Sequence, residues 1–405
     1  MKIAVMGYGT VGSGVVEVIE SHEASIANGT NDEKMEVAKI LDLRDFPGDA
    51  HEALFTKDFN DILNDDEIKV VAETMGGVNP AYDFTMKLLK AGKSVVSSNK
   101  ELVAQKGPEL LAAAEESGAN YLFEASVGGG IPIIRPMSQC LVANNIEGIA
   151  GILNGTTNFI LTKMIEDGMN FADALKLAQD NGYAEKDPTA DIEGFDACRK
   201  VCILASLAFG KHVYPNQVET EGISNITLED VSYIESANGV IKLLGQIKYI
   251  SENKIAAFVS PAVVFRGSQL ASVNGVFNAI LVRGDAVGDV CFYGPGAGKL
   301  PTASAVVADM VDCVKHINRK KFFGWGQGAE DYVVDYKECI EMPFYVRAKT
   351  SESKIKAAFG DVKFLSRIGQ PSDEKAFITD KMTQNKLSKK LEGFEVLNII
   401  KVTNY

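Results

Sequence analysis

Two charged side chains of opposite sign interrupt an otherwise apolar stretch near the middle of the chain. Asp196 and Lys200 lie four residues apart, just before the largely apolar run Val201–Phe209. Residues at this spacing share one face of a helix, and a helix that is apolar nearly all round is normally buried. A buried ammonium is costly without a partner. The pair is therefore a structural ion pair or a tuned proton donor, and taken alone the structural interpretation is favoured.

The helix that carries this pair is predicted to begin at Pro188 and Thr189. Asp187 precedes them and can cap the helix, while Asp191 lies near the positive end of its dipole. We expect the helix to continue through the apolar stretch to Phe209. Asp196 and Lys200 then lie on the same face of this helix.

A glycine-rich turn lies near the N-terminus, between a predicted strand and a predicted helix. Gly7-Tyr8-Gly9-Thr10-Val11-Gly12 follows the apolar strand Lys2–Met6 and opens a helix that continues through Ile19. In this context the first glycine permits a tight turn, the second lets a pyrophosphate approach the backbone, and the third lets helix and strand pack closely. The phosphates then bind at the helix N-terminus. The context favours a dinucleotide site over a turn without a ligand.

The residues after the second predicted strand, Glu36–Leu41, could select the cofactor. Asp42 could bind the ribose diol of NAD, whereas Arg44 could accommodate the 2′-phosphate of NADP. Both are present, so the choice stays open, with a preference for NADP through Arg44.

Strands and helices continue to alternate along the first third of the chain. The predicted strands are Val70–Thr74, Lys93–Ser97 and Asn120–Ala125, and the predicted helices are Pro80–Ala91 and Pro108–Ser117. This alternation predicts a parallel, doubly wound sheet. Ligands bind beyond the carboxyl ends of such strands, where Asn99, Lys100, Glu124 and the loop 127–130 are expected.

Two loops in the middle of the chain could bind ions. Three glycines after Val127 leave carbonyl groups uncovered, and with Glu124 they could hold a hard cation, although a flexible hinge is the simpler interpretation. A predicted strand Gly148–Asn154 ends in Gly-Thr-Thr, where Thr156 and the following amides could hold a substrate carboxylate. A helix cap explains these threonines equally well, and both interpretations can hold together.

Composition restricts the class of partner. The chain has 405 residues, 46% of them hydrophobic, and a net charge of −13, which argues against nucleic acid and anionic membranes as partners. No apolar run approaches the roughly 18 residues of a membrane span, and the first residues lack the pattern of a secretory signal. Six cysteines show no metal spacing and no disulfide framework. We expect a cytoplasmic protein that acts on small molecules.

The C-terminal half is predicted to be mixed α+β. Phe258–Arg266 and Cys291–Tyr293 are predicted strands separated by a loop, and Pro301–Ile317 is a helix expected to pack on the cofactor domain. Residues 324–328 are predicted to form a linker. Beyond it, the elements expected at 343–350, 353–359, 362–368, 375–379, 384–391 and 394–402 follow the order βαββαβ.

Six segments occur in the order and at about the spacing of one known family. They are GYGTVG, SSNKELVA, EASVGGGIPI, GILNGTTNFIL, GYAEKDPTADIEGFDACRK and YGPGAGKLPTASAVVAD. Together these segments, within about residues 1–319, closely resemble homoserine dehydrogenase. The fourth and fifth are the most diagnostic, because neither is a general feature of dinucleotide-binding folds. The resemblance implies the reversible, NAD(P)-dependent reduction of L-aspartate 4-semialdehyde to L-homoserine in threonine and methionine biosynthesis.

The resemblance also implies roles for single residues. Lys200 matches the catalytic acid and base, and Lys100 the lysine beside the reacting centre and the nicotinamide. Asp196 is expected to tune Lys200 because of its helical spacing. Glu185, Asp191 and Asp196 match the family's substrate-pocket carboxylates. Contact of Thr156 with the substrate carboxylate is our own hypothesis. The cofactor is expected to contact Gly7, Tyr8, Gly9, Thr10, Val11, Gly12, Arg44, Lys100 and Gly296. A monovalent cation, usually sodium in this family, is implied at Glu124, Val127, Gly129 and Ile131.

The chemistry agrees with these roles. Reduction of an aldehyde needs a hydride from the nicotinamide and a proton for the developing alkoxide. The chain has four histidines, none in these segments, so a histidine acid is not expected. A lysine can donate the proton if burial lowers its pKa, an effect that Asp196 opposes.

We expect three domains. They are a Rossmann-type cofactor domain at 1–136 plus about 294–323, an α+β substrate and dimerisation domain at 137–293, and a C-terminal βαββαβ domain at 335–405. The family resemblance implies a homodimer, and the position of the last domain resembles the ACT regulatory domain of some relatives. The turn expected after its first strand is missing, because the chain has Thr350-Ser-Glu-Ser353 there. A role in dimerisation is therefore favoured over threonine binding.

Two other functions are weighed against the dehydrogenase. A semialdehyde dehydrogenase that forms an acyl-enzyme needs a cysteine nucleophile with a nearby base, and Cys140, near the site loops, has no histidine close in sequence. A sensor that binds a dinucleotide and an amino acid without catalysis has the same cofactor fold. The set Lys100, Glu185, Asp196 and Lys200 argues against a sensor, which has no use for a buried proton donor.

Overall fold

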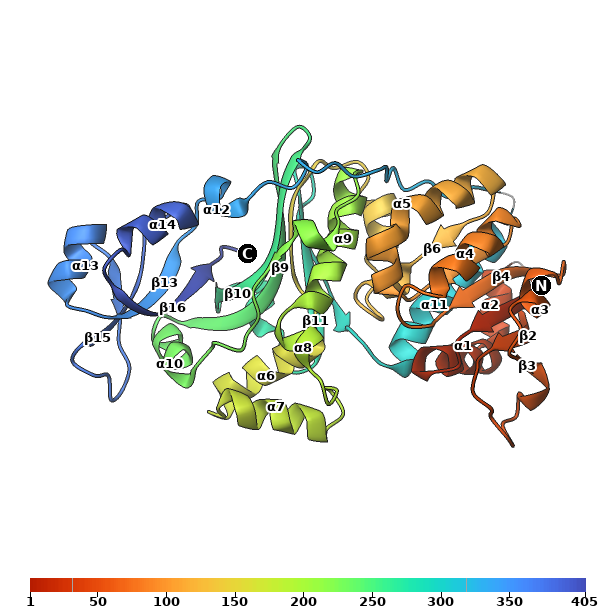
Figure 1. Cartoon of the computed structure of the whole chain (residues 1–405), viewed down its shortest axis with the longest axis horizontal. Coiled ribbons are helices and arrows are strands. Elements are labelled where there is room, and N and C mark those ends of the chain that lie inside the picture. The colour runs from red at the N-terminus through yellow and green to blue at the C-terminus, as the bar shows by residue number, and fades with distance from the viewer. Residues whose placement is uncertain (31, 318) are drawn as a thin grey trace. The chain divides into compact units, whose positions relative to one another are not determined.

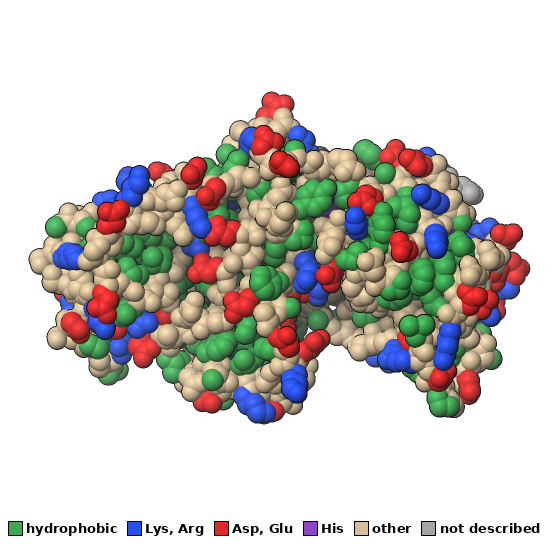
Figure 2. All heavy atoms as spheres, viewed as in Figure 1, with side chains coloured by type: hydrophobic (Ala, Val, Ile, Leu, Met, Phe, Trp, Pro, Cys, Tyr) green, Lys and Arg blue, Asp and Glu red, His purple; other side chains and the backbone are tan. Residues whose placement is uncertain are grey.

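The computed structural model describes every residue except 31 and 318. Its contacts divide the chain into two compact units, each made of segments far apart in sequence (Figure 1). The first unit comprises Met1–Asn144, Cys202–Pro215 and Gly294–Ala329, and the second comprises Asn145–Val201, Asn216–Tyr293 and Glu330–Tyr405. On the face shown in Figure 2, acidic and basic side chains are interspersed. None of the helices among the described residues is long and apolar enough to span a membrane.

The first unit is built on a six-stranded parallel sheet with the order β3-β2-β1-β4-β5-β6. Its strands are β1 (Lys2–Met6), β2 (Glu36–Leu41), β3 (Phe55–Thr56), β4 (Ile68–Glu73), β5 (Ser94–Ser97) and β6 (Tyr121–Leu122). This order is that of doubly wound dinucleotide-binding folds. The predicted parallel sheet is confirmed.

Helices cover the sheet of this unit. They are α1 (Thr10–Ser21), α2 (Glu23–Gly29), α3 (Asn60–Leu63), α4 (Ala81–Lys90), α5 (Lys100–Ser117) and α11 (Lys299–Lys315). Residues 3–6 of β1 are fully buried, as expected for a parallel strand covered on both faces. Val15 of α1 and Val306 of α11 pack in one core cluster with Val5. The helix expected at Pro301–Ile317 therefore packs on the cofactor-binding sheet, as predicted.

The second unit contains a ten-stranded mixed sheet with the order β12-β11-β7-β9-β10-β16-β13-β15-β14, in which β8 also pairs with β10. The strands are β7 (Ile146–Ile152), β8 (Glu219–Thr220), β9 (Gly239–Ser251), β10 (Lys254–Phe265), β11 (Phe277–Gly284), β12 (Gly288–Pro295), β13 (Phe344–Lys349), β14 (Lys363–Leu365), β15 (Glu374–Ile378) and β16 (Glu395–Val402). The helices that accompany it are α6 (Gly155–Glu166), α7 (Phe171–Asp180), α8 (Thr189–Ile192), α9 (Phe195–Phe209), α10 (Leu228–Ser236), α12 (Tyr336–Cys339), α13 (Glu352–Phe359) and α14 (Gln384–Lys390). The predicted mixed α+β character of this region is confirmed.

The C-terminal elements follow the predicted βαββαβ order closely. β13, α13, β14, β15, α14 and β16 each lie within about three residues of the expected bounds. Their strands take the order β16-β13-β15-β14, and β16 pairs in parallel with β10 through Lys401 and Val402. The segment 335–405 thus shares one sheet with residues 137–293. Its relationship to ACT domains, and its folding as a domain of its own, stay predictions.

Three local expectations are wrong. The helix expected from Pro108 begins earlier, at Lys100, because the side chain of Asn99 caps it by accepting from the Leu102 amide. The helix expected to run from Pro188 to Phe209 is broken into α8 and α9 at Gly194, whose φ of 81° is left-handed.

The third error concerns the region between residues 237 and 288. The segment expected as a loop between Asn274 and Gly288 contains β11, and the long strand β9 was not predicted. The expected linker 324–328 lies outside the helices and strands, between α11 and α12, and within it Trp325 is only 7% exposed and packs edge-on against Phe123. Burial by distant segments decides these cases.

Candidate active site

Lys200 is buried near the start of α9 and bound by two acceptors. Its Nζ donates to Asp196 Oδ2 at 2.7 Å and to the carbonyl oxygen of Leu153 at 2.6 Å. The exposed fractions are 7% for Lys200 and 4% for Asp196. The break at Gly194 starts α9 afresh, so that Asp196 lies in the first turn and Lys200 one turn further on the same face. The pair expected from the spacing is therefore present and shielded from water.

Asn154 joins the two carboxylates of this site, and sequence reasoning missed it. Its Nδ2 donates to Asp191 Oδ1 at 2.7 Å and to Asp196 Oδ2 at 3.0 Å. Its Oδ1 accepts from the Thr157 amide at 2.9 Å and so caps α6. One amide side chain thus anchors a helix and orients two acids. Asn154 could have been identified from the sequence, because it directly precedes Gly-Thr-Thr, where an N-cap is expected.

The two acids held by Asn154 crowd negative charge beside Lys200. Burial raises the pKa of Asp191, and the negative charge of Asp196 raises it further. A second cation, in addition to Lys200, would lower the repulsion between these two carboxylates. The arrangement is suited to a ligand that carries an ammonium group.

Thr156 and Glu185 lie in different surroundings. Thr156 is buried, and its hydroxyl donates to the carbonyl oxygen of Tyr183 at 2.6 Å, which ties α6 to the segment before α8. Glu185 is exposed, and its backbone carbonyl accepts from Gln179. The structure therefore brings Asp191, Asp196 and Lys200 together, whereas the hydrogen bond of Glu185 is made to Gln179.

The glycine-rich loop after β1 lets a ligand approach its backbone and lets α1 pack close to β1. Gly7 has a φ of 90°, a region that favours glycine. A Cβ on Gly12 would overlap the carbonyl oxygen of Gly7 and lie 2.8 Å from Thr74 Oγ1, whereas a Cβ on Gly9 would meet nothing within 4 Å. The third glycine therefore permits helix–strand packing, and the second leaves the backbone open. Both features fit a bound pyrophosphate.

Asp42 and Arg44 form a two-pronged ion pair beside this loop. Arg44 Nε lies 3.0 Å from Asp42 Oδ1, and Nη2 lies 2.8 Å from Oδ2. Asp42 Oδ2 also accepts from the Tyr8 amide at 2.7 Å. The hydrogen bond from Arg44 holds the pKa of the Asp42 carboxyl well below its usual range. The acid therefore secures the loop, and the guanidinium, with 61% of the side chain exposed, faces solvent next to it.

Lys100 is the first residue of α5 and lies beyond the carboxyl end of β5. Asn99, its neighbour, caps this helix and donates from Nδ2 to the carbonyl oxygen of Gly77 at 2.6 Å. Lys100 is half-buried and belongs to the first unit. It thus lies at the edge of the sheet where a ligand was expected.

Glu73, the last residue of β4, is a buried acid that sequence reasoning did not single out. It accepts from Ser97 Oγ at 2.6 Å and from the Met75 amide at 2.8 Å. Burial raises its pKa to about 7. An acidic residue in an apolar strand was the available signal.

Glu124, in the short turn Glu124–Ser126 after β6, binds backbone amides. Its Oε1 accepts from Ile133 and Ile134 at 2.6 and 2.7 Å, and its Oε2 accepts from Arg135 at 2.8 Å. A carboxylate offers about four lone-pair positions, so about one remains for a cation. Among the described residues, no three His, Cys, Asp or Glu side chains come together as a metal site. Any cation here would depend mainly on the carbonyls of Val127, Gly129 and Ile131.

The loop at Gly296 packs directly on these glycines. A Cβ on Gly129, whose φ is 55°, would overlap the carbonyl oxygen of Gly296. The Gly130 amide donates to the carbonyl oxygen of Pro295 at 3.1 Å. The two loops can therefore pack this closely only because Gly129 has no side chain.

A parallel sheet of this order, with its glycine-rich loop open at the second glycine, is the cofactor-binding part of a nicotinamide-dependent oxidoreductase. Comparison with known families agrees. Residues 7–124 match the model of the homoserine dehydrogenase NAD binding domain, and residues 132–311 match that of homoserine dehydrogenase. The chain belongs to the homoserine dehydrogenase family, as the resemblance predicted. It is an NAD(P)-dependent oxidoreductase that interconverts L-homoserine and L-aspartate 4-semialdehyde.

Individual relatives are similar over most of the chain. The chain is 41% identical to a homoserine dehydrogenase of Pseudomonas aeruginosa over 359 residues, 87% of this chain and 82% of that one. It is also 41% identical to the Bacillus subtilis enzyme, over 78% of this chain and 73% of that one. A solved homoserine dehydrogenase from Thiobacillus denitrificans is similar at a TM-score of 0.90 and 35% identity, covering 100% of this chain and 98% of that one. A hyperthermophilic archaeal homoserine dehydrogenase, solved in complex with NADPH, gives a TM-score of 0.65 at 28% identity, covering 77% and 96%.

Proposed function

We propose that Lys200 exchanges the proton in this reaction and that Asp196 keeps its ammonium group positioned. The observation that carries the proposal is the buried 2.7 Å contact between Lys200 Nζ and Asp196 Oδ2. The bound nicotinamide supplies or accepts the hydride. In the direction of reduction Lys200 donates a proton to the aldehyde oxygen, and in oxidation it takes the proton of the homoserine hydroxyl. Asn154 holds Asp196 so that this exchange starts from a fixed geometry.

The substrate ammonium is proposed to bind at the acidic groups beside Lys200. Asp191 and Asp196 already share one amide donor, and the ammonium would reduce the repulsion between them. Glu185 is the third candidate, because it precedes α8 in the family-specific segment. Thr156 and the first amides of α6 are candidates for the substrate carboxylate.

Replacement of Lys200 tests the first proposal. Lys200→Ala should lower the rate of homoserine oxidation by about 10²- to 10⁴-fold and leave the dissociation constant for the cofactor unchanged. Lys200→Arg keeps a cation that does not release its proton near neutral pH, and should be almost as slow. Lys176→Ala, an exposed lysine of α7, is the control and should be fully active. Turnover retained by either Lys200 variant would overturn the role.

NADP is the proposed preferred cofactor. The exposed guanidinium of Arg44 lies beside the glycine-rich loop, and the charge of Asp42 is already compensated by it. A 2′-phosphate would find a cation there rather than a carboxylate free to bind a ribose diol. The related archaeal enzyme solved with NADPH supports this preference. Arg44→Ala should raise the KM for NADP and leave the KM for NAD unchanged. The control is Lys57→Ala, which removes an exposed positive charge elsewhere in the same unit and should change neither KM.

A sodium ion is proposed at Glu124 and the carbonyls of Val127, Gly129 and Ile131. The donors are all oxygen, as a hard cation prefers, and about one lone pair of Glu124 remains for it. Thermal unfolding in sodium chloride and in choline chloride of equal ionic strength tests this. A higher unfolding temperature in sodium supports the site, and equal temperatures contradict it.

We further propose a cytoplasmic homodimer that functions in threonine and methionine biosynthesis. The C-terminal segment is proposed to serve assembly, because β16 extends the sheet of the second unit and the turn after β13 is Thr350-Ser-Glu-Ser353. Activity should therefore be unchanged by millimolar threonine, and sedimentation should give a dimer mass. Clear inhibition by threonine would defeat the assembly role in favour of regulation.

A further inference from the structure

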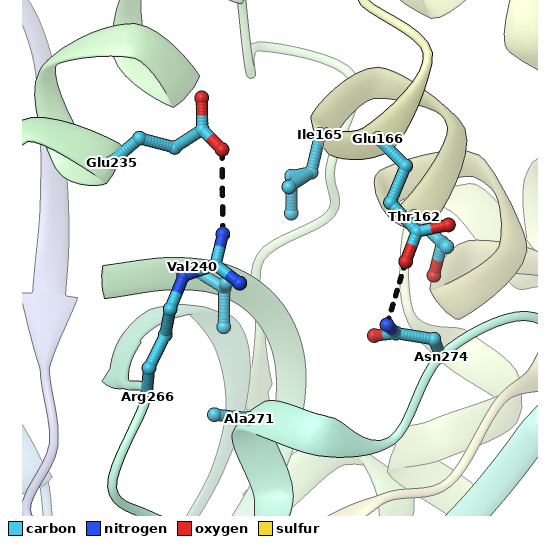
Figure 3. A pocket seen from close by; sticks show the side chains of 8 residues that line it. All are labelled: Thr162, Ile165, Glu166, Glu235, Val240, Arg266, Ala271 and Asn274. Carbon is cyan, nitrogen blue, oxygen red and sulfur yellow. Dashed lines mark hydrogen bonds and ion pairs between the residues drawn. The ribbon is translucent and has the colours of Figure 1, made fainter. Parts of the chain in front are cut away.

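Two cavities of the second unit differ in how the charges of their lining side chains are compensated. In the cavity of Figure 3, Arg266 pairs with Glu235 at 3.4 Å, and Glu166 accepts from Asn274 at 2.7 Å. Each charged side chain of this cavity therefore has a partner among the other lining residues. A larger cavity of about 240 Å³ lies between β9, the end of β16 and the segment before β13. It has room for several water molecules and so for a small organic molecule.

A buried amide without a partner lines the larger cavity. Gln246 of β9 is 2% exposed, and its Nε2 has no hydrogen-bond partner in the structure. A buried donor left unsatisfied costs about 1–3 kcal/mol, and such groups in folded proteins need an explanation. An acceptor bound in the cavity would provide one.

The same cavity is lined by more positive than negative side chains. Of the described residues, no acidic side chain forms an ion pair with Lys248 or Lys381, whereas Lys401 is paired with Glu221 at 2.7 Å. Burial, together with the positive charges of Arg283 and Lys381, lowers the pKa of Lys248. Glu341 adds one negative charge to the lining. The lining therefore keeps a net positive charge, carried by Lys248 and Lys381, beside the unpartnered amide of Gln246. This combination suits carboxylate oxygens.

We propose that this cavity binds a small dicarboxylate through Lys248, Lys381 and Gln246. The two ammonium groups match its two charges, and the amide donates to one of its oxygens. Lys381 belongs to the segment between β15 and α14, and Gln246 and Lys248 belong to β9. The ligand would thus join the C-terminal βαββαβ elements to the strands that precede them in the sheet. The site contains none of the residues assigned to catalysis and does not depend on those assignments.

Calorimetric titration of the full-length protein with succinate tests the proposal. Succinate should bind at millimolar concentration or tighter, and saturating homoserine should not displace it. Lys381→Gln, which changes an exposed side chain and leaves the fold intact, should weaken binding at least tenfold, as should Lys248→Gln. Lys389→Gln, an exposed lysine of α14 outside the cavity, removes the same charge and should bind like the unmodified protein.

Each other outcome overturns the proposal. No heat of binding means that the cavity has no affinity for the probe. Displacement by homoserine assigns succinate to the substrate site. Equal weakening in Lys389→Gln assigns the effect to net charge, and tighter binding of inorganic phosphate than of succinate assigns the cavity to a different anion.

Discussion

Replacement of the buried Glu73 by glutamine tests whether its carboxyl is protonated in the folded enzyme. Burial raises the pKa of Glu73 from 4.5 to about 7. Between these two values the folded state binds more protons than the unfolded state, so the free energy of unfolding falls as the pH rises from about 4.5 to about 7, and it stays lowered above that range. At about 1.36 kcal/mol per pKa unit, this cost is about 1 kcal/mol at pH 5 and about 3 kcal/mol at pH 8.

Glutamine has the same shape as glutamate and does not ionise. Relative to the unmodified protein, Glu73→Gln should therefore gain about 2 kcal/mol more stability at pH 8 than at pH 5. Urea unfolding is best followed by the fluorescence of Trp325, because it is the single tryptophan of the chain and lies buried in the same unit. Glu36→Gln, at an exposed position of β2, is the control and should change stability by less than about 0.5 kcal/mol at either pH. An equal effect of Glu73→Gln at both pH values would refute the reasoning, because Glu73 would then ionise alike in both states.

Two further substitutions test the site and the loop. Asn154→Ala removes the donor shared by Asp191 and Asp196, and a hydrogen bond to a charged group contributes about 1.5–3 kcal/mol. We expect kcat/KM for homoserine to fall at least about tenfold with unchanged cofactor affinity in a fluorescence titration; loss of both would point to unfolding instead. Gly12→Ala forces a methyl group onto the Gly7 carbonyl and should lower the unfolding temperature, whereas Gly9→Ala, where the added atom meets nothing, should keep that temperature and weaken cofactor binding. Equal unfolding temperatures in the two glycine variants would contradict the packing argument.

Local sequence patterns predicted the elements whose structure depends mainly on residues close by in the sequence. The strands β1 and β2 were predicted at their observed bounds, because a short apolar run between turn residues has few alternatives in a parallel sheet. The βαββαβ order of residues 335–405 was predicted for a similar reason, since each of its two helices, α13 and α14, begins at its own N-cap. The start of α5 was missed because Pro108 was taken as a helix start, whereas the cap at Asn99 begins the helix eight residues earlier.

Contacts between segments far apart in sequence decided the elements that local patterns did not predict. β9 is long and contains Lys242 and Gln246, two polar residues that are buried by the surrounding sheet and loops. Lys242 donates to Asn158 and to the carbonyl oxygen of Val273, groups that no local pattern brings together. A strand with such residues does not show the apolar alternation on which prediction depends.

The sequence by itself determined the dinucleotide fold, the family and the pair Asp196 and Lys200, because strand and helix periodicity and a four-residue helical spacing are local properties. Only the tertiary structure decided what surrounds that pair. Asn154 reaches Asp191 and Asp196 from positions 37 and 42 residues away, and the carbonyl of Leu153 meets Lys200 across 47 residues. Such contacts depend on how β7 and α9 pack, since burial makes each polar group take the partner that packing brings to it.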